Sequence, residues 1–143
     1  MFNDILVVCV GNICRSPTGE YLLKSLLPNK NISSAGISAL VGKGADKLAI
    51  DVANANGVDL SKHKAQQLTK ELCKKFDLIL VMEPGHLSAV TEISPESRGK
   101  VILLSKWEDF ATIPDPYRQS KEAFEHAYSL IYSSCVSWVE KLG

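Results

Sequence analysis

The sequence predicts an α/β fold in which a four-stranded parallel sheet carries helices on both faces. Short apolar runs alternate with segments of helical periodicity along the chain, which is the pattern of consecutive strand-helix-strand units. The length of 143 residues is close to that of one common domain, and no repeat, low-complexity tract or linker interrupts it. We therefore expect residues 1–143 to form a single domain.

Each strand of the predicted sheet is a short apolar run bounded by polar residues or turn formers. The first run, Ile5–Val8, leads directly into Cys9, and a glycine-containing loop from residue 36 to 44 follows the second. Runs that are apolar at every position suit strands covered on both faces. The four strands are expected at residues 4–9, 31–34, 78–82 and 101–104.

Capping and stop signals bound the predicted helices. Ser16 and Pro17 have the residue types of an N-cap and a first helical residue, and Pro28-Asn29 ends that helix. Gly57 ends a second helix, and a short helix at residues 69–75 leads into the third strand. The last helix is expected from about residue 121 to 142. The inward apolar positions are Leu22, Leu23, Leu26 and Leu27, then Leu48, Ala49, Val52 and Ala53, and finally Phe124, Ala127, Tyr128, Ile131, Cys135, Trp138 and Leu142.

Composition excludes several classes of function. Lysine plus arginine and aspartate plus glutamate each number 16, so no net positive charge attracts nucleic acid or an anionic membrane. No apolar run approaches the ~18 residues of a membrane span, and the N-terminus lacks the basic region of a signal peptide. The four cysteines show no paired spacing, which predicts a cytoplasmic protein with reduced thiols. No cluster of His, Cys and Asp has the spacing of metal ligands, so we expect no metal and no cofactor. We expect Cys73 and Cys135 in the core, and His86 and His126 at the surface.

The segment that follows the first strand carries the strongest chemical signal. Cys9 and Arg15 are separated by five residues, and Ser16 opens the following helix. Backbone N–H groups of such a loop converge into an anion-binding nest, and the helix adds its positive N-terminal end. The loop residues between the two are Val10, Gly11, Asn12, Ile13 and Cys14.

This loop has the properties of a phosphate-binding site with a nucleophile at its base. Arg15 can direct two N–H donors onto phosphate oxygens, which lysine cannot do. The positive surroundings favour the thiolate form of Cys9, which is the nucleophilic form. Ligands of parallel sheets bind beyond the carboxyl ends of the strands, where this loop lies. The sequence therefore predicts a phosphatase that forms a phosphocysteine intermediate.

Over essentially its whole length the chain resembles the low-molecular-weight protein tyrosine phosphatases. The resemblance rests on the loop at residues 9–16, on Ser34-Ala35-Gly36, on His63-Lys64-Ala65 and on Asp115-Pro116-Tyr117. It is greatest to the bacterial branch found beside capsule and exopolysaccharide tyrosine kinases. The resemblance implies a phosphotyrosine protein substrate, the tyrosine-rich tail of such a membrane-bound kinase, and a monomeric enzyme that does not itself enter the membrane.

The same resemblance assigns supporting residues around the loop. Ser16 supplies a hydroxyl to the Cys9 thiolate, and Asn12 adopts a left-handed backbone conformation and bonds to Ser34 and His63. From spacing alone these polar residues also fit ordinary loop positions. The family match favours the supporting role.

Asp115 is the expected general acid, because the departing phenolate needs a proton and the resulting carboxylate can then activate water. On its own the Asp115-Pro116 pair also fits a turn start. Tyr117 would stack on the substrate ring, and Leu40 would line the opposite wall. Where the family often has a second tyrosine the chain has Arg118, which makes the rim of this slot more basic.

Cys14 allows two interpretations. It is either a small filler of the loop or a redox partner that condenses with oxidised Cys9 before irreversible oxidation. We favour the second and expect a redox-sensitive enzyme. Gln66 stands where the family usually has arginine, which predicts the loss of a structural ion pair.

Three other functions use a related cysteine loop. An arsenate reductase needs resolving cysteines near the exit of the third strand, and residues 83–95 contain none. A phosphotyrosine reader would not turn over substrate. A phosphocysteine carrier of a sugar-uptake system would not place a carboxylate over its phosphoryl group. Turnover of an aryl phosphate without metal separates the enzyme from a reader or a carrier.

Overall fold

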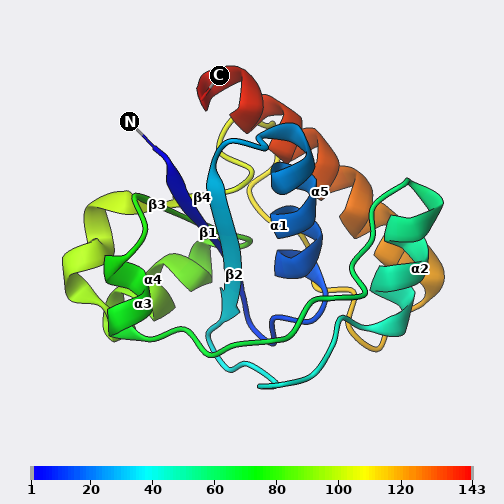
Figure 1. Cartoon of the computed structure of the whole chain (residues 1–143), viewed down its shortest axis with the longest axis horizontal. Helices are drawn as coiled ribbons and strands as arrows, with labels where there is room; N and C mark the ends of the chain where they lie inside the picture. The colour runs from blue at the N-terminus through cyan, green and yellow to red at the C-terminus, as the bar shows by residue number, and fades with distance from the viewer. Residues whose placement is uncertain (1, 143) are drawn as a thin grey trace.

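In the computed structural model, which describes residues 2–142, helices and strands alternate along the chain (Figure 1). The elements in order are β1 (Asp4–Cys9), α1 (Arg15–Leu26), β2 (Asn31–Gly36), α2 (Lys47–Ala55), α3 (Lys70–Lys74), β3 (Leu78–Val81), α4 (Pro84–Ile93), a 3-10 helix η1 (Pro95–Lys100), β4 (Val101–Leu103) and α5 (Lys121–Leu142).

The strands form one parallel sheet in the order β2-β1-β3-β4. The inner strand β1 pairs with β2 on one side and with β3 on the other, so that Val7 lies opposite Ser34 and Leu80. All four strands therefore end at the same edge of the sheet, and the first crossover starts at Cys9. The predicted α/β fold with a four-stranded parallel sheet is confirmed.

Helices cover both faces of the sheet. Figure 1 shows α1, α2 and α5 on one side and α3 and α4 on the other. Along β1, Ile5 and Val7 pack in the core beneath α1 and α5, whereas Leu6 and Val8 pack in the core beneath α3 and α4. Because each strand residue faces the side opposite to its neighbour, a strand buried on both faces is apolar throughout. Burial of both cores holds Cys9 in place at the end of the strand.

The structure contains a helix that the sequence analysis did not predict. Residues Pro84–Ile93 form α4, with Pro84 at its start and Leu87, Val90 and Ile93 in the core on that side of the sheet. This apolar spacing of three residues is a helical signal. The expectation that His86 lies at the surface is wrong: its side chain is buried at the start of α4. His126 on α5 is exposed as expected, and Cys73 and Cys135 are buried in the core as expected.

Helix α1 begins earlier than predicted. The helix starts at Arg15 with Cys14 in the N-cap position, so Ser16 is not the cap and Pro17 is not the first residue. The Ser16 hydroxyl contacts Cys9 and Asn12 in place of a free N–H of its own helix. Strand β2 extends two residues beyond the predicted end, to Gly36, and β3 and β4 each end one residue early.

No helix of the described residues has the length and apolar character needed to cross a membrane.

Candidate active site

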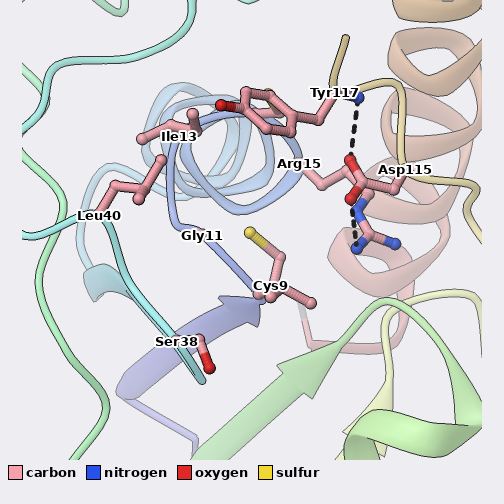
Figure 2. Close-up of a pocket in the computed structure, with 10 residues that line it drawn as sticks. Cys9, Gly11, Ile13, Arg15, Ser38, Leu40, Asp115 and Tyr117 are labelled. Carbon is pink, nitrogen blue, oxygen red and sulfur yellow. Dashed lines mark hydrogen bonds and ion pairs between the residues drawn. The ribbon is translucent and has the colours of Figure 1, made fainter. Parts of the chain in front are cut away.

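A cavity of about 170 Å³ opens at the carboxyl end of β1, with Cys9 at its base (Figure 2). Its walls come from the loop after β1, from the loop after β2 and from the segment before α5. It is lined by Cys9, Val10, Gly11, Ile13, Cys14, Arg15, Ser38, Leu40, Asp115 and Tyr117. The structure thus brings Cys9, Arg15, Asp115, Leu40 and Tyr117 to one place, as the sequence predicted.

The carbonyl groups of the loop accept hydrogen bonds from residues outside the loop, which fixes the orientation of its backbone. The carbonyl oxygen of Asn12 bonds to the His63 ring. The other carbonyl oxygens accept from backbone N–H groups: Cys9 from Ile37, Val10 from Ser38, Gly11 from Leu40, Ile13 from Asp46 and Cys14 from Thr18. In a trans peptide the N–H points opposite to the preceding carbonyl. Within the described residues no acceptor bonds the N–H groups of residues 10–15. These N–H groups are therefore free to bind an anion.

Asn12 holds the loop from within. Its φ of 59° lies in the left-handed region that asparagine tolerates better than most residues. Its Nδ2 donates to Ser16 Oγ at 2.7 Å and to Ser34 Oγ at 2.9 Å. Its Oδ1 accepts from the backbone N–H of Gln66 at 2.9 Å. The completely buried amide thus ties the loop to α1, to β2 and to the segment before α3.

A second layer of buried polar groups surrounds Asn12. Nε2 of His63 lies 2.6 Å from the carbonyl oxygen of Asn12, and its Nδ1 lies 3.8 Å from Oε1 of Glu20. The same Glu20 oxygen accepts a hydrogen bond from Ser34, and its other oxygen pairs with Lys24 at 2.7 Å. Each of these groups fixes the hydrogen-bonding direction of the next.

The two cysteines of the loop have different surroundings. Cys9 Sγ lies 2.9 Å from Ser16 Oγ, at the open base of the cavity. Burial raises the pKa of the Cys14 thiol well above its ordinary value, and the negative charge of Asp46 adds to the effect. Cys14 is therefore protonated. Both cysteines are free thiols in this structure.

Arg15 is almost fully buried and is fixed by groups far away in the sequence. Its Nη1 donates to Oε2 of Glu83 at 2.6 Å and to the carbonyl oxygen of Ile113 at 2.7 Å. Its Nη2 lies 3.8 Å from Oδ2 of Asp115. With Nη1 occupied, the remaining N–H groups of the guanidinium are available to a ligand.

The segment before α5 closes one side of the cavity. Asp115 Oδ1 accepts from the backbone N–H of Tyr117 at 3.0 Å, so the carboxylate is held above Arg15 (Figure 2). The rings and side chains of Tyr117, Ile13 and Leu40 form the outer walls. The Arg118 guanidinium lies 5.2 Å from the centre of the Tyr117 ring, and the residue has a positive φ of 62°. The walls can hold a flat apolar group above Cys9.

The sequence analysis did not identify Glu20, Glu83 and His86 as part of this site. Glu20 is buried inside the first helix, where an acidic residue at that spacing has no distinguishing pattern. Glu83 and His86 come from the start of α4, which was not predicted. Gln66 keeps a place in the network, because its Nε2 donates to the carbonyl oxygen of Ser34 at 2.9 Å.

Comparison with known proteins identifies the family. The model of the low molecular weight phosphotyrosine protein phosphatase family matches residues 4–143. The chain belongs to this family. Wzb, a low molecular weight protein-tyrosine-phosphatase of Salmonella typhimurium, is 52% identical to this phosphatase over 142 residues, which cover 99% of this chain and 95% of that protein.

Solved structures of relatives agree with the fold of this phosphatase. Wzb of Vibrio vulnificus in complex with benzylphosphonate is 59% identical with a TM-score of 0.97, and the match covers 99% of both chains. Wzb of Escherichia coli K30 in complex with sulphate is 52% identical with a TM-score of 0.99, over 100% of both chains. The chain is thus a protein-tyrosine phosphatase of the Wzb type, and a hydrolase.

Proposed function

We propose that the enzyme hydrolyses phosphotyrosine through a phosphocysteine intermediate, with Cys9 as the nucleophile, Arg15 as the phosphate ligand and Asp115 as the general acid and base. The observation that carries the proposal is the meeting of these three residues in one cavity, although they are up to about a hundred residues apart. The free N–H groups of residues 10–15 support it, because the unpaired N–H groups of such a loop can converge on an anion.

The first step forms a bond between sulfur and phosphorus. The Cys9 thiolate attacks phosphorus, the bond from phosphorus to the tyrosine oxygen breaks, and the proton of Asp115 passes to the leaving phenolate. Arg15 and the loop N–H groups stabilise the charge on the three equatorial oxygens. Asp115 stands 3.8 Å from Arg15, at the mouth through which the leaving group must depart.

The second step returns the enzyme to its starting state. The Asp115 carboxylate takes a proton from water, the water oxygen attacks phosphorus, and the bond to Cys9 breaks to release inorganic phosphate. The Ser16 hydroxyl, 2.9 Å from Cys9 Sγ, can donate to the sulfur as it regains its negative charge. Asn12, Ser34 and His63 act by holding the loop and do not touch the reacting atoms.

The substrate we propose is phosphotyrosine in a tail of a membrane-bound bacterial tyrosine kinase that controls exopolysaccharide production. Tyr117 and Leu40 form walls that suit an aromatic ring, and a ring on a methylene phosphonate is bound by the Vibrio vulnificus relative. We place this reaction in the reducing cytoplasm, because it depends on a free thiol. Comparing turnover of the phosphorylated tail with that of phosphoserine peptides tests this substrate.

The role of Asp115 provides the sharpest test of the mechanism. A general acid matters most for a poor leaving group, and the tyrosine phenol, with pKa ~10, is a far poorer leaving group than nitrophenol. In Asp115→Asn the single-turnover rate of phosphotyrosine cleavage should fall by ~100-fold or more, whereas that of a nitrophenyl phosphate should fall much less. Equal slowing of both substrates would show that Asp115 only shapes the loop.

A further inference from the structure

The carboxylate of Glu83 lies between two basic side chains. Its Oε2 is 2.6 Å from Nη1 of Arg15 and 3.8 Å from Nε2 of His86. Glu83 occupies the N-cap position of α4 but makes no capping hydrogen bond there. Its charge is thus directed to Arg15 and His86 and not to its own helix.

No hydrogen bond determines the protonation state of His86. The side chain is only 7% exposed, and its Nδ1 is the buried side-chain nitrogen or oxygen atom in residues 2–142 that lacks a partner. Its Nε2 lies 3.8 Å from Oε2 of Glu83, which is its one ion-pair partner among the described residues. Burial lowers the pKa of His86, and the positive charge of Arg15 lowers it further, while Glu83 and Asp115 act in the opposite direction. The imidazole is therefore neutral at neutral pH.

The charged groups that act on His86 come from three segments. They are Arg15 from α1, Glu83 at the start of α4 and Asp115 before α5. Strands β3 and β4, against which α4 packs, contain no titratable side chain. In η1, Glu96 pairs with Lys70, and Lys100 donates to backbone carbonyls beside α3. Arg98 of η1 lies beside Ser88 and Thr91 of α4 and is not among the groups that shift the pKa of His86. The charge balance at His86 is thus set at the active site.

A bound oxyanion changes this balance. The Arg15 guanidinium is shared by two carboxylates, Glu83 at 2.6 Å and Asp115 at 3.8 Å. A phosphate or sulfate ion on Arg15 adds negative charge and competes with Glu83 for the same cation. Because Glu83 then shares Arg15 with the anion, a second cation beside Glu83 becomes more favourable. The His86 imidazole already lies at ion-pair distance from the Glu83 carboxylate.

We propose that His86 takes up a proton from solvent when an oxyanion binds at Arg15, and that the resulting imidazolium becomes the ion-pair partner of Glu83. The proton converts His86 to a cation with N–H on both ring nitrogens, and no other covalent bond changes. In the anion-bound site the imidazolium then pairs with Glu83, and Arg15 turns from Glu83 towards the ligand. His86 is a positioning residue in this scheme, because it acts on the ligand through Glu83 and Arg15. The inference rests on the proposed function, since it takes the Cys9–Arg15 loop as an oxyanion site.

By thermodynamic linkage, proton uptake and anion binding favour each other equally. We expect saturating sulfate to raise the pKa of His86 by about one unit, as an opposite charge brought close to it would. Sulfate keeps the same charge between pH 5 and 8, so the anion itself does not titrate. A shift of one unit corresponds to sulfate binding that is about tenfold tighter below the titration of His86 than above it.

The direct test is an NMR titration of the histidine ring protons of the full chain, with and without sulfate. The chain has three histidines, and the exposed His126 on α5 is the internal control. The inference is supported if the His86 midpoint rises in sulfate, the His126 midpoint stays constant, and the rise disappears in Glu83→Gln. It is overturned if the His86 midpoint stays constant or falls, or if Glu83→Gln shows the same rise.

Inhibition by sulfate provides a second readout that a merely structural role would not change. In the wild type, the sulfate inhibition constant should rise about tenfold as His86 loses its proton. This rise should be absent in His86→Gln and unchanged in His126→Gln. Equal profiles for the wild type and His86→Gln would overturn the inference. If sulfate fails to compete with an aryl phosphate at any pH, the oxyanion site itself is wrong and the proposed function falls with it. Competition without a response of His86 overturns this inference alone.

Discussion

Replacing Asn12 tests how strongly one buried amide maintains the anion-binding loop. The side chain makes three hydrogen bonds, to Ser16, to Ser34 and to the N–H of Gln66, and the residue has a φ of 59°. Asn12→Gly removes the bonds but permits this backbone conformation. Asn12→Ala removes the same bonds and also places a Cβ in the left-handed region.

The expected magnitudes follow from these contacts. Three bonds at a net ~1 kcal/mol each lower the free energy of unfolding of Asn12→Gly by about 3 kcal/mol. The left-handed conformation makes Asn12→Ala about 1 kcal/mol less stable again, after allowing for the greater unfolded-state entropy of glycine. The free energy of unfolding of such domains is roughly 5–15 kcal/mol, so both variants should still fold.

Urea denaturation followed by circular dichroism measures both differences. With a slope of about 1.5 kcal/mol/M, the midpoint should fall by about 2 M in Asn12→Gly and by more in Asn12→Ala. Asn54→Ala is the matched control: Asn54 is exposed on α2, so its free energy of unfolding should stay within about 0.5 kcal/mol of that of the wild type. Losses below about 1 kcal/mol in both Asn12 variants, or an alanine variant as stable as the glycine variant, would refute the reasoning.

Three further predictions concern the thiols and the packing of the loop. Cys9→Ser should abolish turnover while still binding sulfate, and residual hydrolysis free of wild-type enzyme would contradict the phosphocysteine route. Peroxide should inactivate the wild type reversibly but Cys14→Ser largely irreversibly, because the sulfenic acid of Cys9 then lacks a partner thiol. The measurement is the activity recovered with a thiol reductant. Equal recovery in both proteins would make Cys14 a filler of the loop. In Gly36→Ala the new Cβ would lie 2.5 Å from the carbonyl oxygen of Val10, which must displace the loop, so kcat should fall and the variant should lose about 1–3 kcal/mol of stability. Gly85→Ala has nothing within 4 Å of its Cβ and lies in helix α4, so it should keep wild-type kcat and be at least as stable as the wild type. Equal kcat for the two alanine variants would show that the loop tolerates the displacement.

The resemblance and the local patterns of the sequence were sufficient for the fold and for much of the candidate site. Apolar runs such as Ile5–Val8 are buried strands because every one of their side chains faces a helix-covered side of the sheet. The loop from Cys9 to Arg15 is a short contiguous segment, so its spacing alone indicates converging N–H groups at the end of a strand. Asn12 could be expected in a left-handed conformation because few other residues tolerate one.

Only the tertiary structure showed what holds Arg15 and what surrounds it. Its bonds to Glu83 and Ile113 span 68 and 98 residues, and no local pattern specifies a pairing across such distances. His86 follows a proline and a glycine on a helix that the sequence analysis did not predict, and its side chain is buried beside Glu83 in the folded chain. Local sequence determines the backbone conformation of neighbouring residues, whereas the partners of a buried charge depend on which strand ends the topology brings together. The anion-binding loop was therefore visible in the sequence, but the carboxylate and the imidazole behind its arginine were not.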